Sequence, residues 1–107
     1  MPTALVCAND AAALGCMEVL SRAGIRVPGD VRIVGFDDTI AARTSMPQLT
    51  TIRQPLRMMG AKAVELLVKP EILGGAGDDN IVFPTQPAFR TSVAPPSPRR
   101  VVVPPID

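Results

Sequence analysis

Two short apolar runs, residues 3–8 and 31–36, flank a stretch with helical periodicity. Unbroken apolar runs of this length are typical of parallel strands that are covered on both faces. Between them, residues 11–22 predict a helix whose sheet-facing side carries Ala13, Met17 and Leu20 at helical spacing. Gly24 follows as a C-terminal glycine. The order strand, helix, strand predicts a right-handed βαβ unit with parallel strands, and therefore an α/β fold with a parallel sheet and flanking helices.

The second half of the chain has a weaker pattern. Residues 40–43 suggest a short helix, and the β-branched run 49–52 predicts a strand. A second helix is expected after Pro55, because proline is tolerated in a first turn, and it should end by Pro70. Its apolar stripe comprises Leu56, Met59, Ala63, Leu66 and Leu67.

Beyond this helix, glycine and proline dominate. Residues 74–79 are Gly-rich and predict a loop, while residues 80–83 and 88–89 are candidates for short edge strands near Pro84 and Pro87. The Gly-rich segment lacks the preceding strand and the Lys-Ser/Thr pair of a phosphate-binding loop. Residues 95–107 are rich in proline, which predicts an extended, poorly ordered tail.

Polar residues follow both strands of the βαβ unit at the point where each strand ends. Asn9 and Asp10 follow the first strand, and Asp37 and Asp38 follow the second. Carboxyl ends of parallel strands share one edge of a sheet, where ligands of open α/β folds bind. Carboxylates and amides suit the recognition of hydroxyl groups. Asp10 is best explained as the helix cap, so Asn9 and Asp37 are the better candidates for ligand contact. The simpler alternative is that all four residues form turns or caps.

The composition removes several classes of function. The net charge is +1 and the aromatic residues are three Phe, which gives neither a basic footprint for nucleic acid nor a platform for base stacking. There is no His, the commonest general base and metal ligand. Cys7 and Cys16 match no zinc or redox motif, and we expect no metal and no cofactor. No signal sequence or membrane span is evident, so we expect a cytoplasmic protein without membrane contact.

Three ordered segments resemble the sensor domain of the LacI/GalR (lactose-repressor) family of bacterial transcriptional regulators. They are Ala-Asn-Asp at 8–10 with Ala-Leu-Gly at 13–15, Val-Pro-Gly-Asp-Val at 27–31 leading into Val-Gly-Phe-Asp-Asp at 34–38, and Pro-Gln-Leu-Thr-Thr-Ile-Arg-Gln-Pro at 47–55. A weaker fourth segment joins Phe83-Pro84 to Arg-Thr-Ser at 90–92. Together they cover about residues 3–94. Pro70, the Gly-rich insert and Pro87 depart from the family pattern.

The resemblance implies a partial periplasmic-binding-protein-like (type I) fold, in which two subdomains close around a small effector. Residues 1–52 would belong to the C-terminal subdomain, residues 53–80 to an excursion into the N-terminal subdomain, and residues 81–94 to the return. The DNA-binding helix-turn-helix and the first half of the sensor would be absent from this chain. In the family, positions matching Asn9 and Asp37 contact the effector, and the position matching Gln54 lies at the hinge of the cleft. The resemblance therefore makes Asn9, Asp37 and Gln54 the candidate effector-binding residues.

The first helix is also a candidate dimer interface. Its first two turns carry no charged residue from 11 to 17, so Leu14 lacks an obvious partner on an otherwise apolar surface. Another part of the protein would cover it, or a second copy would do so. The resemblance favours a homodimer contact through this helix, with Leu14 and Met17 as its candidate residues.

The leading hypothesis is therefore an effector-sensing and dimerisation part of a transcriptional regulator, not an enzyme. Its effector would be a sugar or nucleoside-like molecule, and operator DNA would be bound only through the absent headpiece. The alternative is a sugar-binding protein of an uptake transporter, which has the same fold and requires export. An Mg²⁺-dependent enzyme is a third class, because three carboxylates lie near one edge, but no nucleophile, Lys or His accompanies them.

Overall fold

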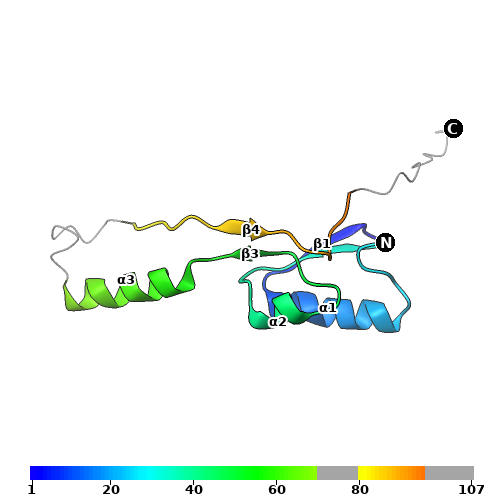
Figure 1. Ribbon diagram of the computed structural model, residues 1–107, viewed down its shortest axis with the longest axis horizontal. Helices are drawn as coiled ribbons and strands as arrows, with labels where there is room; N and C mark the ends of the chain where they lie inside the picture. Colours follow the sequence, from blue (N-terminus) through cyan, green and yellow to red (C-terminus); the bar gives the residue numbers. More distant parts are fainter. Residues whose placement is uncertain (70–79, 96–107) are drawn as a thin grey trace.

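The computed structural model describes residues 1–69 and 80–95 (Figure 1). The elements are, in order, β1 (Ala4–Val6), α1 (Asp10–Arg22), β2 (Arg32–Val34), α2 (Ile40–Thr44), β3 (Thr51–Arg53), α3 (Leu56–Val68) and β4 (Gln86–Ala88). The Gly-rich segment 74–79 and residues 96–107 of the predicted tail lie outside the described part.

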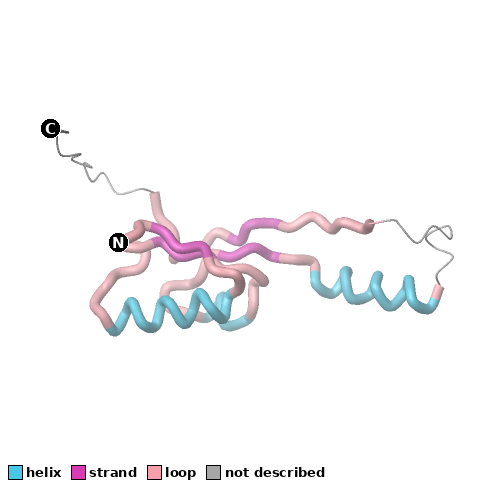
Figure 2. The backbone as a smooth tube through the Cα atoms, turned by 180° about the vertical axis from the view of Figure 1, so that it is seen from behind, coloured by secondary structure: helices cyan, strands magenta, loops and turns pink. Residues whose placement is uncertain are grey.

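The βαβ unit forms as the hydrophobic pattern predicts. β1 and β2 pair in parallel, with Leu5 opposite Ile33. α1 packs on them through Ala13 and Met17, which are buried together with Val31, Ile33, Ala42 and Leu49. α1 and α2 lie on one side of the strands in both backbone views (Figures 1 and 2). This small core holds the ends of β1 and β2 at one edge.

The end of β2 and the segment that follows it run parallel to β3 and the residue before it. Val34 bridges Thr50 and Asp37 bridges Arg53, both in parallel orientation, and the amide of Gly35 donates to the carbonyl of Thr50 over 2.9 Å. β3 then pairs antiparallel with β4. The described strands therefore form two two-stranded sheets, β1–β2 and β3–β4, which these bridges join, and the residues that follow β2 lie against the end of β3.

The cap of α1 differs from the prediction, which assigned it to Asp10. Asn9 is the N-cap, and its Oδ1 accepts from the amide of Ala12 at 2.8 Å. Asp10 is fully buried, where its carboxylate accepts from the Thr51 hydroxyl at 2.6 Å and from the Thr39 amide at 2.7 Å. Asn and Asp are equally good caps, so the local sequence could not decide between them.

Gly35 makes room for the buried Asp10. A Cβ at position 35 would lie 2.9 Å from Cδ2 of Leu49 and 3.2 Å from Cα of Asp10, and would also clash with the Asp10 carboxylate. Because Leu49 is a core residue and Asp10 is held by two hydrogen bonds, neither can move away cheaply. The absence of a side chain at 35 is what lets α1 begin this close to β2.

We therefore expect Gly35→Ala to lower the free energy of unfolding by about 1–3 kcal/mol, the usual cost of overpacking. Urea denaturation measures it. Gly60→Ala is the matched control: Gly60 lies inside α3 with no atom near its would-be Cβ, so alanine should be neutral or stabilising by about 0.5–1 kcal/mol. Equal stabilities of Gly35→Ala and the unmodified protein would contradict the close packing.

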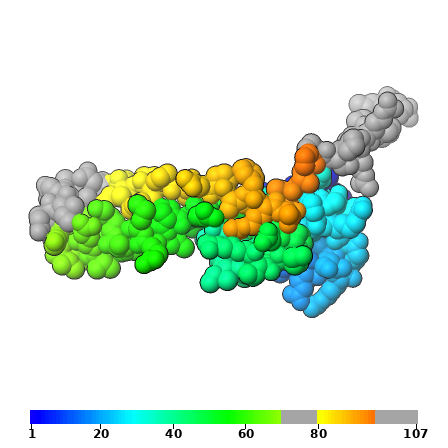
Figure 3. Space-filling model, viewed as in Figure 1, coloured from blue at the N-terminus to red at the C-terminus, as the bar shows by residue number. Residues whose placement is uncertain are grey.

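The second half of the chain forms an extension away from this core. α3 ends at Val68, before Pro70 as predicted, and buries no residue. α3 and residues 80–88 run alongside one another away from α1 and α2 (Figures 1 and 3). The predicted strand at 80–83 is wrong: the strand lies at Gln86–Ala88 and includes Pro87 opposite Ile52. An edge strand tolerates a proline, which has no amide to donate.

In the described residues no helix combines the length and the hydrophobicity that a bilayer span requires.

Candidate functional site

The exit of β2 places two consecutive carboxylates in an unusual backbone conformation. Asp37 has φ 123 and Asp38 has φ 60, both in the left-handed region. Aspartate tolerates this region better than most residues other than glycine, but a φ above 100° is costly, and such outliers cluster at ligand sites. The turn is held in place because the Asp37 amide donates to the Ile52 carbonyl at 3.0 Å. The two side chains then take separate partners.

Asp37 pairs with Gln54. The Gln54 Nε2 donates to Oδ1 of Asp37 over 2.7 Å, and both residues are partly buried. Within residues 1–69 and 80–95, Oδ2 of Asp37 has no hydrogen-bond partner. Two of the three residues predicted to contact an effector thus lie together, and between them they offer a free acceptor and an amide. Such a pair can accept a hydrogen bond from a hydroxyl group through the carboxylate and donate one to it through the amide.

Asn9 lies at the same edge, one residue from the contact between the Asp10 amide and the Phe36 carbonyl (3.0 Å). Its side chain is exposed and caps α1. The structure shows no hydrogen bond between Asn9 and the Asp37–Gln54 pair in the part it describes. The amide nitrogen of Asn9 remains available as a donor, since only the oxygen takes part in the cap.

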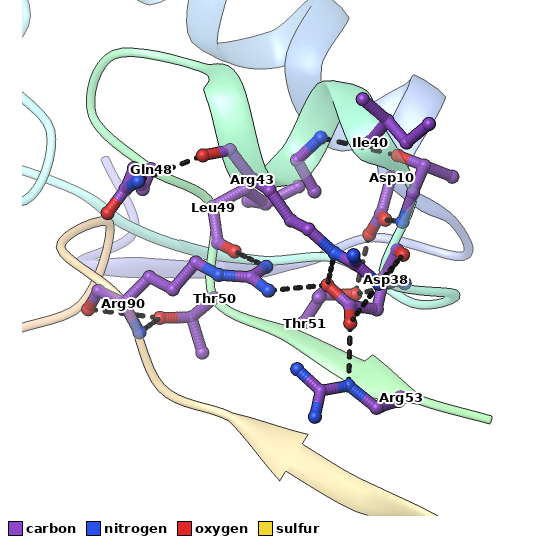
Figure 4. A network of polar contacts seen from close by, with 12 residues as sticks. Asp10, Asp38, Ile40, Arg43, Gln48, Leu49, Thr50, Thr51, Arg53 and Arg90 are labelled. Carbon is purple, nitrogen blue, oxygen red and sulfur yellow. Dashed lines mark hydrogen bonds and ion pairs between the residues drawn. The ribbon is translucent and has the colours of Figure 1, made fainter. Parts of the chain in front are cut away.

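Asp38 is the centre of a cluster that the sequence did not reveal (Figure 4). Its side chain is 1% exposed and forms ion pairs with three arginines. Arg90 Nη2 approaches Oδ1 to 2.5 Å, while Arg53 Nε and Arg43 Nη2 approach Oδ2 to 2.7 and 3.1 Å. We call these four residues the Asp38 cluster. It joins the exit of β2, α2, the end of β3 and the segment after β4.

The cluster keeps Asp38 ionised. Burial by itself would raise the pKa of this carboxyl, but the hydrogen bonds from Arg53, Arg90 and Arg43 outweigh it and hold the pKa far below its ordinary value. Arg90 is itself mostly buried, with its side chain 13% exposed, and its Nη1 also donates to the Leu49 carbonyl at 2.9 Å. The carboxylate thus remains a fixed negative charge at neutral pH.

The two predicted dimer contacts lie elsewhere. Met17 is 7% exposed and belongs to the core, whereas Leu14 packs only partly against it. Both line a groove of about 610 Å³ between the second half of α1 and the loops at 24–27 and 45–47. Neither Asn9, Asp37 nor Gln54 lines this groove. The polar edge and this groove, which both apolar and charged residues line, are therefore separate surfaces.

The polar edge carries three carboxylates, which differ in the hydrogen-bond partners that they have among the described residues. No group of three potential metal ligands occurs in the residues that the structure places. Asp38 is saturated by arginines and Asp10 by Thr51 and Thr39. Among the described carboxylates at this edge, Asp37 therefore has the oxygen without a hydrogen-bond partner. A single carboxylate beside an amide can recognise a polar ligand.

Comparison with known proteins identifies the fold family. Residues 1–93 match the periplasmic binding protein-like domain family. The transcriptional repressor PurR of Haemophilus influenzae strain PittEE is 46% identical over 69 residues, which cover 64% of this chain and 20% of that protein. The transcriptional regulator GalR of Escherichia coli K12 is 47% identical over 64 residues, which cover 60% and 19%. The chain thus spans about a fifth of the length of these relatives.

Solved structures give the same result. A dimeric lac repressor with an 11-residue C-terminal deletion superposes with a TM-score of 0.80 at 36% identity, covering 90% of this chain and 35% of that one. A LacI-family regulator from Enterococcus faecium with bound ribose also has a TM-score of 0.80, at 29% identity and with coverage of 89% and 35%. The chain belongs to the periplasmic binding protein-like domain family and corresponds to part of the sensing domain of a LacI/GalR-family transcriptional regulator.

Proposed function

We propose that this chain senses a small hydroxylated effector on behalf of a bacterial transcriptional regulator. The observation that carries the proposal is the Asp37–Gln54 pair, which leaves one carboxylate oxygen free at the common end of β2 and β3. Asn9, at the same edge, would add an amide donor. Solved relatives support this chemistry, since one contains ribose and another, CelR, contains cellobiose. The effector class is accordingly a sugar or a nucleoside-like molecule.

We further propose that the chain contributes to both walls of an effector cleft. Residues 1–52 form one subdomain, the chain crosses at Arg53 and Gln54 into residues 53–80, and residues 81–94 return. The separation of α3 from the core supports this division, because none of its apolar side chains is buried within the described residues. Operator DNA would be contacted by a helix-turn-helix headpiece outside these 107 residues, and the chain itself would carry no catalytic role.

Replacing Gln54 by leucine in the intact regulator tests the proposed site. Leucine keeps the size of the side chain but removes the amide, so effector affinity should fall about tenfold, the loss of roughly one hydrogen bond to a polar ligand. A thermal-shift panel of D-ribose, D-galactose, cellobiose and adenosine selects the compound, and calorimetry measures its Kd. Unchanged affinity in folded Gln54→Leu protein would remove Gln54 from the site.

We also propose that α1 contributes to a homodimer through Leu14. Leu14 borders the groove beside α1, where Met17, Ile25 and Met46 are further apolar residues, and a C₂ interface brings one apolar patch against its own copy. The lac repressor that superposes on this chain is itself described as dimeric. Because Met17 is already covered by the core, Leu14 should carry more of the contact than Met17.

Leu14→Lys should therefore shift the intact protein from dimer to monomer, since burial of each leucine contributes about 1.5–3 kcal/mol. Analytical ultracentrifugation measures the mass. Val19→Lys is the matched control, because Val19 is an exposed residue of α1 that does not line the groove, and it should leave the dimer intact. A Leu14→Lys protein that sediments as an undiminished dimer would exclude this contact.

A further inference from the structure

Asp38 follows Asp37, one of the proposed effector-binding residues, but its side chain binds different partners. Asp37 binds Gln54, and the adjacent Asp38 binds Arg53, the residue that precedes Gln54. Neighbouring residues after β2 and at the end of β3 thus form two separate side-chain pairs, one polar and one ionic. We propose that Asp38 is a positioning residue: held by Arg43, Arg53 and Arg90, it fixes the end of β3 so that Gln54 meets Asp37. The role in effector recognition, though not the positioning itself, rests on the function proposed above.

The ties between the two strand ends support this role. The Asp37 amide binds the Ile52 carbonyl at 3.0 Å, the Asp38 amide binds the Thr51 hydroxyl at 3.3 Å, and the Asp38 carboxylate binds Arg53 at 2.7 Å. The first two contacts hold residues 51 and 52. The Asp38–Arg53 contact reaches Arg53, the residue next to Gln54, which backbone pairing with Asp37 and with Gln86 also holds. It therefore adds a side-chain tie where the chain leaves the sheet toward α3.

The same hydrogen-bond network extends to the strand end that carries Asn9, the third candidate for effector contact. The Thr51 hydroxyl accepts from the Asp38 amide and donates to Oδ1 of Asp10 at 2.6 Å. Asp10 follows Asn9 and begins α1. A continuous set of hydrogen bonds therefore links the Asp38 cluster to both strand ends that carry Asn9 and Asp37. Fully satisfied buried networks of this kind rigidify the groups that they connect.

The charges in the cluster explain why the carboxylate is needed. Three guanidinium groups converge on Asp38 (Figure 4). Without its negative charge they repel one another, and Arg53, whose side chain is 53% exposed, is free to turn toward water. The end of β3 would then lose this side-chain tie and keep only its backbone pairing with Asp37 and β4, while Arg90, bound also to the Leu49 carbonyl, would stay in place.

The test measures Gln54 directly in the intact protein by NMR of its side-chain amide, assigned by its absence in Gln54→Leu. In the unmodified protein, we expect the Gln54 amide protons to exchange with water at least tenfold more slowly than those of Gln86, an exposed residue of β4. Asp38→Asn keeps the shape and tolerates the left-handed backbone, and should bring Gln54 to within twofold of Gln86. Arg53→Ala, at a half-exposed position that should not impair folding, should do the same.

Val31→Ala separates positioning from general stability. Val31 is buried in the core away from the cluster, so its truncation should lower the unfolding midpoint without changing the exchange of Gln54. Three results would each overturn the inference. They are fast exchange of the Gln54 amide protons in the unmodified protein, unchanged exchange in Asp38→Asn or in Arg53→Ala, and an equal acceleration of exchange in Val31→Ala. No effector is present in this experiment. Its outcome is therefore independent of the calorimetry on Gln54→Leu, and either proposal can fail alone.

Discussion

Replacement of Asp38 by alanine should lower the free energy of unfolding of the intact protein by about 3–5 kcal/mol, the usual cost of removing one partner from a buried ion pair. The carboxylate is almost completely buried and accepts from three arginines. Its loss leaves Arg90, which is 13% exposed, as a largely buried and uncompensated cation. Arg43 and Arg53 contribute less to the penalty, because both are about half exposed and water solvates them.

Urea denaturation followed by circular dichroism measures this loss. Glu18→Ala is the matched control, since it breaks an ion pair with Arg22 in which the two side chains are 63% and 74% exposed. Exposed pairs of this kind contribute about 0.2–1 kcal/mol. If Asp38→Ala were no more destabilising than Glu18→Ala, the cluster would not stabilise the fold.

The cluster also predicts how stability depends on pH. The pKa of Asp38 is lowered by folding, so the unfolded chain binds this proton more readily than the folded one. The stabilisation is complete above the ordinary pKa of 3.8, and it declines as the pH falls below that value. The free energy of unfolding of Asp38→Ala should depend less steeply on pH in acid, because its unfolding takes up as much as one proton fewer. Parallel curves for the two proteins between pH 4 and pH 2 would contradict the lowered pKa.

The βαβ unit was predictable because its signals are local. Apolar runs without alternation, a helical stripe and Gly24 act over a few residues, and they defined β1, α1 and β2. α3 was predictable for the same reason, between Pro55 and Pro70. The strand at Gln86–Ala88 overlaps the candidate at 88–89 only at Ala88. Its start was placed too late because Pro87 argues against a strand, and the pairing of Pro87 with Ile52 on an edge overrides that preference.

The buried role of Asp10 was not predictable from the local sequence. Its environment depends on Gly35 and Thr51, which are distant in the chain, whereas its capping propensity is local. The Asp38 cluster is the same kind of feature. Arg53 lies 15 residues and Arg90 lies 52 residues from Asp38, and no periodicity connects them. The proximity of Asp37 and Gln54 became expected through the family resemblance, which placed both near one cleft.

The second large effect concerns Asp37. Asp37→Gly removes the carboxylate and adopts φ 123 without steric cost, so any loss of binding reports the carboxylate and not backbone strain. Effector hydroxyl groups left unpaired in a closed cleft cost about 1–3 kcal/mol, which corresponds to a loss of affinity of roughly tenfold or more. Stability should change little, because the Asp37 side chain binds only Gln54 among the described residues.

Calorimetric titration of the intact regulator is the most direct measurement of the central claim, that this edge recognises an effector. The unmodified protein and Asp37→Gly are titrated with the compound that the thermal-shift panel selects, and operator binding without effector serves as the control for folding. We predict a Kd at least tenfold higher in Asp37→Gly with operator binding retained. An unchanged Kd in a variant that still binds operator would contradict the assignment of the site.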